Sequence, residues 1–338
     1  MLAMTKFLVS GVFTSMTVFM GTIGNILSII TLLHKYAALP QRQNYTFFLQ
    51  EMRNVFNHLL VAMCMVDLLV ILTNLVTAGR TFLPNNLLLI KIAPWIDGFC
   101  HISVSASVFL TIAITMERYF AVCFPYTYQS RLAGKGHWCI IISYIFPVFF
   151  SAILFNLPKI LQLTRIVSLA HIFPDRGSYI KIGIISQVFH PLATTCLIPI
   201  LMLSFLNLSI LHGSKKKSRS TSRMDISMAR TMMTIVTVFI ILIIPKMVLA
   251  LYEVSTIPDI DDCYESSCFY YLSSKRWAMD ILIRYLVMLN SSINFIIYCF
   301  VGSNFRNTLK QIFLNIGPEK CGPCSPTACP WTHLLEKL

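Results

Sequence analysis

Residues 101–125 read HISVSASVFLTIAITMERYFAVCFP, an apolar run that leads into the triplet Glu117-Arg118-Tyr119. A bilayer has a hydrocarbon core about 30 Å thick, which a helix of about 20 apolar residues crosses. This run is long enough to cross it. Charged side chains are costly in lipid, so the triplet indicates the point where the helix reaches water. The stretch therefore predicts a membrane-spanning helix that carries the triplet at its end.

Six more apolar runs have the same character. Together the seven cover roughly residues 6–33, 54–79, 92–122, 137–156, 180–212, 226–252 and 277–301. The chain of 338 residues is 56% hydrophobic and only 12% charged, with a mean hydropathy of +0.70. This composition excludes a cytosolic enzyme, a disordered protein and a disulfide-rich secreted domain. The expected fold is an all-α membrane protein, a seven-transmembrane helix bundle with a short amphipathic eighth helix.

The expected organisation is one integral membrane domain with short ends. Its segments are residues 1–5 as an extracellular N-terminus, 6–301 as the seven-helix domain, 302–314 as the amphipathic helix and 315–338 as a cytoplasmic tail. Lys and Arg concentrate on the cytoplasmic side of membrane proteins. A cytoplasmic C-terminus places 16 of them on inner segments and 9 on outer ones. The net charge of +13 then indicates topology and contact with inner-leaflet lipid, and not nucleic acid.

Several polar side chains lie inside the apolar runs, where an unsatisfied polar group is costly. Asp67 lies in the middle of the second run. The others in this group are Asn25, Ser107, Asn290, Ser291 and Asn294. A carboxylate with several hydroxyl and amide oxygens can form a plain hydrogen-bond network, hold ordered water or hold a hard cation. The sequence leaves these alternatives open, including an allosteric Na⁺ at Asp67, and predicts no other cofactor or metal.

Six features in chain order give the sequence a family resemblance. They are Gly24-Asn25, Asp67, Glu117-Arg118-Tyr119, Pro199 with Asn207, Phe239 with Pro245, and Asn294 with Tyr298. With them, the chain resembles the rhodopsin-like (class A) G-protein-coupled receptors over essentially its whole length. Finer details resemble the invertebrate FMRFamide-type neuropeptide receptors: the runs at residues 117–123, 155–159 and 290–299.

The sequence departs from the usual family pattern at several places. Phe295 stands where the family usually has a proline, and Ile243 where it usually has a tryptophan. Residues 156–181 contain no cysteine for the usual outer disulfide, and the N-terminus is very short. These departures favour either a truncated sequence or a divergent receptor.

The resemblance implies a receptor and not an enzyme, located in the plasma membrane, that passes a signal from an extracellular ligand to a heterotrimeric G protein. Arrestin and a receptor kinase are further implied partners. The implied activation switch consists of Glu117, Arg118, Tyr119, Phe239, Pro245, Asn294 and Tyr298. In this mechanism Glu117 holds Arg118 in the resting state, and activation releases Arg118 toward Tyr298 and the G protein.

Helical periodicity places the ligand pocket. Arg118 faces the bundle interior, so Cys100, five turns away at 3.6 residues per turn, faces it too. Lys246 follows Pro245 and lies near the same cavity. The expected pocket residues are Cys100, His101, Val104, Gln187, His190, Lys246, Glu253, Asp280 and Arg284.

Some of these residues have simpler alternatives. Asp280 and Arg284 have the i,i+4 spacing of an ordinary helix-surface pair. His190 precedes a proline and can instead cap a helix or contact lipid headgroups. Lys246 needs a partner if buried, which a ligand carboxylate, Glu253 or Asp280 can supply.

The charges favour two different ligands. The acidic outer loop contains Glu253, Asp259, Asp261, Asp262 and Glu265, which attract a basic peptide. Lys246 and Arg284 lie deeper and favour a ligand with a carboxylate. On the resemblance, we expect an amidated, FMRFamide-like neuropeptide, with a carboxylate-bearing small ligand as the alternative. A small transporter is a more distant alternative, because neither internal repeats nor matching broken helices are visible.

Cysteines outside the spans form two groups. Cys263 and Cys268 lie five apart in the last outer loop and can close a small disulfide ring. In the tail, Cys321, Cys324, Cys329 and His333 have metal-ligand spacing. Thiols just after an amphipathic helix are also typical palmitoylation sites. We expect palmitoylation rather than zinc, with an unmodified tail as the alternative.

Overall fold

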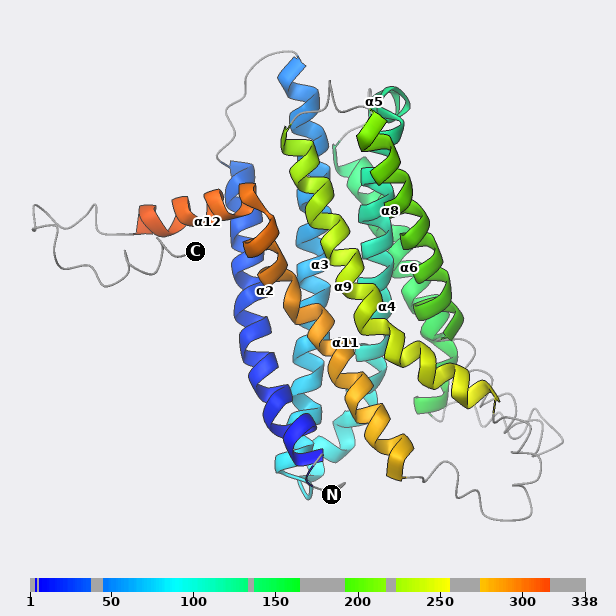
Figure 1. Cartoon of the computed structure of the whole chain (residues 1–338). Coiled ribbons are helices and arrows are strands. Elements are labelled where there is room, and N and C mark those ends of the chain that lie inside the picture. The colour runs from blue at the N-terminus through cyan, green and yellow to red at the C-terminus, as the bar shows by residue number, and fades with distance from the viewer. Residues whose placement is uncertain are drawn as a thin grey trace, which may run out of the picture.

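The computed structural model describes the chain as one helical bundle (Figure 1). The residues it describes are 4, 6–37, 45–132, 137–164, 192–216, 223–255 and 274–316. Within these residues there is no strand, and seven helices are long and apolar enough to cross a membrane. The predicted all-α, seven-span fold is therefore confirmed.

The helices follow the predicted spans in chain order. The described elements are η1 (Phe7–Phe13), α2 (Thr14–Ala37), α3 (Tyr45–Phe82), α4 (Leu87–Cys123), α5 (Pro125–Leu132), α6 (His137–Thr164), η3 (Leu192–Leu197), α8 (Ile198–Lys216), α9 (Arg223–Ser255), α11 (Ser274–Val301) and α12 (Ser303–Ile316). The first span combines η1 with α2, and the fifth combines η3 with α8. The remaining spans are α3, α4, α6, α9 and α11.

α4 lies in the interior of the bundle. It packs against α3, α6 and α8, while α11 packs against α2, α9 and α3. The core between α3 and α4 contains the fully buried side chains of Leu59, Met63, Leu110 and Ile114. Lipid tails are as apolar as these side chains, so close packing, and not the release of water, holds membrane helices together.

Side-chain and backbone chemistry determines where α4 begins and ends. The side chain of Asn86 accepts a hydrogen bond of 3.2 Å from the backbone N–H of Leu89, which satisfies a free donor in the first turn. At the other end, Pro125 opens α5 only two residues after Cys123. Proline suits the first position of a helix because the N–H that it lacks would have no partner there. α5 therefore starts immediately beside the end of α4.

A tight turn at Gly302 separates α11 from α12. A Cβ atom on Gly302 would lie 2.7 Å from the carbonyl oxygen of Tyr298, so a side chain does not fit there. Nη1 of Arg306 donates to the carbonyl oxygens of Cys299 and Phe300, at 3.1 and 2.7 Å. These bonds satisfy carbonyls that the end of a helix leaves without partners. α12 consequently leaves the bundle at an angle, as Figure 1 shows, and matches the amphipathic helix predicted at residues 302–314.

Two helical segments were not predicted. Residues 45–53 precede the predicted second span, and α3 already begins at Tyr45. That stretch contains no glycine or proline, and its charged residues are compatible with a helix that extends beyond the lipid. The helix α5 was not expected at all, because its eight residues carry no span-length apolar signal. Residues 180–191 of the predicted fifth span lie outside the described residues, and the domain boundaries stay a prediction.

Candidate functional site

A buried ion pair lies where α4 ends. Glu117 has no exposed surface and Arg118 is 4% exposed. Nε of Arg118 is 2.7 Å from Oε2 of Glu117, and Nη2 donates to Oε1 at 3.3 Å. Removing a charge from water is costly unless an opposite charge and hydrogen bonds compensate it. Each charge of the pair thus has the opposite charge beside it, and one hydrogen bond joins them.

Tyr128 of α5 contributes a third polar group to this pair. Its hydroxyl donates to Oε1 of Glu117 at 2.6 Å. Burial, and then the charge and hydrogen bond of Glu117, raise the pKa of the Tyr128 phenol well above its ordinary value. The phenol therefore keeps its proton and remains a donor. Tyr128 was not predicted, because its role depends on a short helix that hydropathy does not reveal.

Phe56 of α3 completes what we call the Arg118 cluster, which consists of Phe56, Glu117, Arg118 and Tyr128. The Cζ atom of Arg118 lies 3.8 Å from the centroid of the Phe56 ring. Phe56 is also 4% exposed, so the charge and the ring meet away from water. Three elements, α3, α4 and α5, thus meet at one ion pair.

The other predicted switch residues lie elsewhere in the bundle. The Tyr119 ring packs against Phe120 and Phe124, each at 5.6 Å. Tyr298 is 2% exposed, and its ring lies 5.4 Å from that of Phe305 in α12. Its hydroxyl has no hydrogen-bond partner in the described part of the chain. Phe239 is buried in α9 in one cluster with Ile243, and Pro245 lies half-buried in the same helix.

A second set, the Asp67 network, joins residues of four spans, α2, α3, α4 and α11, in the middle of the bundle. Asp67 is fully buried and accepts two hydrogen bonds of 2.7 Å, one from Ser107 of α4 and one from Asn294 of α11. Asn25 of α2 donates to the backbone oxygen of Ser291 at 3.1 Å. Three of the predicted polar side chains, Asp67, Ser107 and Asn294, thus bond to one another, and Asn25 bonds to the backbone of α11 nearby. The functional role of the set stays a prediction.

A small cavity adjoins the Asp67 network. Its lining includes Ser107, Asn290 and Ser291 together with apolar side chains of α4, α9 and α11. A water-sized sphere can occupy about 20 Å³ of it, and a single water needs roughly 10–15 Å³. One water molecule or one small ion fits, and an organic ligand does not. The cavity lining offers hydroxyl and amide oxygens but not the Asp67 carboxylate, whose two oxygens accept from Ser107 and Asn294. The Na⁺ at Asp67 therefore stays a prediction.

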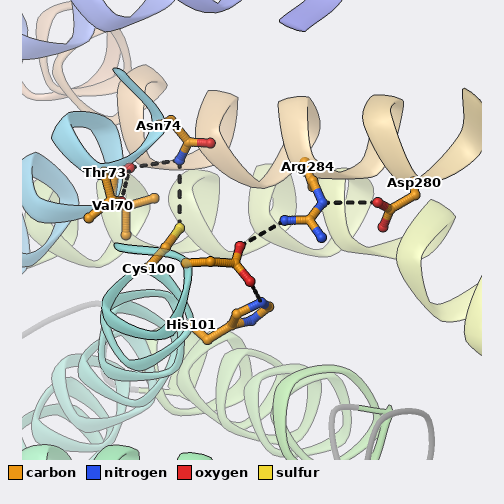
Figure 2. A network of polar contacts seen from close by, with 8 residues as sticks. Val70, Thr73, Asn74, Cys100, His101, Asp280 and Arg284 are labelled. Atoms are coloured by element: carbon orange, nitrogen blue, oxygen red, sulfur yellow. Dashed lines mark hydrogen bonds and ion pairs between the residues drawn. The ribbon is translucent and has the colours of Figure 1, made fainter. Parts of the chain in front are cut away.

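A third set, the Arg284 network, lies at the opposite end of α4 and α11, and Figure 2 shows it. Nε of Arg284 donates to Oδ2 of Asp280 at 2.9 Å, and Nη1 donates to Oδ1 of Asp97 at 3.0 Å. Nε2 of His101 lies 3.6 Å from the other oxygen of Asp97. The expected i,i+4 pair between Asp280 and Arg284 thus exists. Asp97, which joins that pair to α4, was not predicted.

A charge inside a predicted span was the signal that could have identified Asp97. It lies within the run at 92–122, as Asp67 lies within the second run. The same rule that singled out Asp67 therefore applies to it. Its position near the end of the run made it resemble an ordinary boundary charge. Only the position of α11 in space reveals its partner.

Other predicted pocket residues lie near the Arg284 network. Cys100 accepts a hydrogen bond of 3.7 Å from Asn74 of α3 (Figure 2), and Val104 lines the small cavity. Lys246 is half-buried, and its Nζ donates to Oγ1 of Thr195 at 3.0 Å. This partner was not among those considered for Lys246, which were Glu253, Asp280 and a ligand carboxylate.

The structure does not describe several of the predicted site residues. Gln187, His190, Cys263, Cys268, Cys321, Cys324 and Cys329 lie outside the described residues. Glu253 belongs to the last turn of α9, and its side chain is also outside them. Their predicted roles stay predictions. Within the described part of the chain, no group of three or more His, Cys, Asp or Glu residues is arranged to hold a metal ion.

Comparison with known proteins supplies the family. The model of the seven-transmembrane receptor (rhodopsin) family matches residues 45–298. The chain is 26% identical to the FMRFamide receptor of Drosophila melanogaster, over 91% of this chain and 54% of that receptor, so it spans about half the length of that relative. It is 25% identical to galanin receptor type 1 of Rattus norvegicus, over 90% of this chain and 80% of that one. The family is one of receptors and not a class of enzymes. The chain belongs to the rhodopsin family of seven-transmembrane receptors.

Proposed function

We propose that the chain is a plasma-membrane receptor that transmits an extracellular signal to a heterotrimeric G protein. The observation that carries this proposal is the buried Arg118, which contacts Phe56 of α3 and pairs with Glu117 of α4. Glu117 in turn accepts a hydrogen bond from Tyr128 of α5. A charge enclosed by three elements becomes available to a partner when those elements rearrange. Membership in the receptor family supports this role.

In the proposed mechanism, the two ends of α4 are coupled. The ligand binds near the Arg284 network, and the G protein binds near the Arg118 cluster. A ligand shifts a two-state equilibrium only by binding one state better, and a coupling of about 1–3 kcal/mol is typical. The distribution of Lys and Arg supports an extracellular N-terminus and a cytoplasmic C-terminus. We propose arrestin and a receptor kinase as further cytoplasmic partners.

We propose an amidated, FMRFamide-like neuropeptide as the ligand. The name of the Drosophila relative supports this class. The acidic residues at 253–265 support it as well, because they would attract a basic peptide to the outer face.

Cells that co-express this chain with a promiscuous Gα subunit would test the function. We expect a dose-dependent calcium response to one or more members of a panel of amidated peptides. An Arg118→Ala variant with equal surface staining should lose the response, because the group proposed to engage the G protein is gone. An N-terminal epitope stained without permeabilisation checks the orientation. A silent wild-type receptor with good surface staining would contradict the neuropeptide proposal.

A carboxylate-bearing ligand is the second candidate, and Lys246 is the observation that favours it. Its ammonium group donates to the neutral hydroxyl of Thr195. A neutral partner leaves the positive charge able to attract a ligand anion.

Paired ligands that differ only in the terminal amide or free acid would discriminate the two candidates. If the ligand is a carboxylate, the free acid is the more potent form and Lys246→Gln lowers its potency roughly tenfold or more, as expected for a lost charged hydrogen bond. The amidated form should change little in this variant. Equal losses for both forms would contradict a carboxylate site at Lys246.

A further inference from the structure

The contact between Phe56 and Arg118 joins two spanning helices. Phe56 lies in α3 and Arg118 in α4, and the Cζ atom of Arg118 lies 3.8 Å from the ring centroid. Both side chains are 4% exposed. A cation over the face of an aromatic ring is attracted by the negative charge of that face, and more strongly when water is excluded. This contact is therefore electrostatic as well as apolar.

The shape of the guanidinium group lets it make both kinds of contact at once. It is planar, with donors along its edges and a face that stacks on aromatic rings. Nη2 donates to Oε1 of Glu117 and Nε lies 2.7 Å from Oε2, while the carbon at the centre of the group lies close to the Phe56 ring. The ion pair and the ring therefore act on different parts of one group.

The two contacts differ in what they restrain. Glu117 precedes Arg118 in the same helix, so their ion pair moves with α4 and does not connect α4 to another span. Tyr128 bonds to Glu117 from α5, which follows α4 almost directly. Phe56 belongs to α3, so its contact restrains Arg118 relative to a neighbouring spanning helix. Loss of this contact would remove that restraint and leave the ion pair in place.

We infer that Phe56 is a positioning residue that holds Arg118 in the resting orientation through the face of its ring and thereby sets the level of signalling without ligand. This inference rests on the proposed function, because it requires that Arg118 engage the G protein. Phe56 itself touches neither ligand nor G protein in this account. If Phe56 only fills space, signalling without ligand depends on the shape of its ring. If Phe56 positions Arg118, that signalling depends on the charge distribution of the ring.

A series of fluorinated phenylalanines at position 56 separates these possibilities. One, two and three ring fluorines progressively remove the negative charge of the face and change the shape very little. We expect basal signalling per surface receptor to rise with each fluorine, reaching roughly three- to tenfold for the trifluoro ring. Phe56→Leu should raise it similarly, and Phe56→Trp, which strengthens the attraction, should keep it at or below the wild-type level.

The same series at Phe109 is the matched control. Phe109 lies nine residues, or two and a half turns, from Arg118 in the same helix, and its ring packs against Phe155 at 6.0 Å. Basal signalling there should not follow the number of fluorines. A graded response at position 56 that requires Arg118, with none at position 109, supports the inference.

Two outcomes would overturn it. In the first, basal signalling does not change with the number of fluorines at position 56, while Glu117→Gln raises it and Arg118→Ala abolishes the ligand response. The proposed function then stands and the role inferred for Phe56 is wrong. If neither the wild-type receptor nor any variant gives a signal that depends on Arg118, at normal surface levels, the proposed function fails and the inference fails with it.

Discussion

Glu117 is a carboxylate with no exposed surface, and its partners come from two different elements. Arg118 follows it in α4, and Tyr128 reaches it from α5. A buried carboxylate is stabilised by a neighbouring cation and by hydrogen bonds to its charged form. Removal of the Tyr128 hydroxyl should therefore weaken the arrangement that holds the ion pair of Glu117 and Arg118. This is a property of single residues, and single substitutions test it.

Tyr128→Phe removes one hydroxyl group and keeps the ring. A hydrogen bond to a charged group contributes about 1.5–3 kcal/mol. We expect this bond to stabilise the resting state, so basal G-protein signalling per surface receptor should rise about tenfold in the variant. Because the pKa of Tyr128 is raised well above its ordinary value, the phenol stays protonated, and the bond persists at any physiological pH.

Tyr126→Phe is the control for this variant. Tyr126 lies in the same short helix and is 84% exposed, so loss of its hydroxyl should leave basal signalling unchanged. An unchanged basal signal in Tyr128→Phe, at equal surface density, would mean that the hydroxyl does not stabilise the resting state.

At the scale of elements, α2 and α11 approach closely at two glycines. A Cβ atom on Gly21 would lie 2.5 Å from Oγ of Ser292, and one on Gly24 would lie 2.9 Å from Cβ of Phe295. Small residues allow membrane helices to approach in this way. Phe295 occupies the position where the family usually has a proline, and α11 continues through it as a helix to Val301. The bare backbone at Gly24 makes room for Phe295.

Gly24→Ala should therefore destabilise the receptor. Overpacking costs about 1–3 kcal/mol, more than the gain of up to about 1 kcal/mol from replacing a helical glycine by alanine. We expect a lower Tm of the purified receptor in detergent. Gly79→Ala is the matched control, because its added Cβ would lie 3.4 Å from the flexible side chain of Leu89. If the two variants melt at the same temperature, close contact at Gly24 is not what limits packing.

At the scale of the molecule, polar contacts connect α4 with α11 at two levels. Asp97 and Arg284 join them directly at one end of the bundle. Asp67 of α3 joins them in the middle, through Ser107 and Asn294. α11 packs mainly against α2, α9 and α3, and these hydrogen bonds tie it to α4 in the described part of the chain. We predict that a ligand that changes the first contact also changes the second.

Double-mutant analysis of Asp97→Asn and Arg284→Gln measures the first contact. Their side chains are 35% and 49% exposed, so solvent screens the pair, and we expect a coupling of about 0.2–1 kcal/mol in the stability of the purified receptor. Ligand potency is a second readout. Asp280→Asn should lower it less than Asp97→Asn does, because Asp280 lies in the same helix as Arg284 and does not join α11 to α4. Fully additive effects of Asp97→Asn and Arg284→Gln would show that the two helices are not coupled there.

Contacts differ in how far the sequence could predict them. The pair Asp280–Arg284 follows from i,i+4 spacing, and the adjacency of Glu117 and Arg118 is visible in the chain itself. The bond between Asp97 and Arg284 joins residues 187 positions apart. It depends on the rotation of α4 and α11 about their own axes, which hydropathy leaves undetermined. For the same reason the sequence indicated a charged Lys246 but not its partner Thr195.

Hydropathy alone establishes that this is a seven-span helical membrane protein, because a chain in lipid must satisfy its backbone polar groups within each helix. It also locates the buried Asp67 and the Glu117-Arg118 pair, since charges are rare in apolar spans. The neighbours of those charges are determined only when the helices pack. Phe56 over Arg118, Tyr128 on Glu117 and Asp97 beside Arg284 all depend on how one helix is turned and shifted against the next. Many rotations and translations of the helices bury a similar area of apolar surface. Side-chain packing and polar contacts, and not hydrophobicity, therefore select the arrangement that forms.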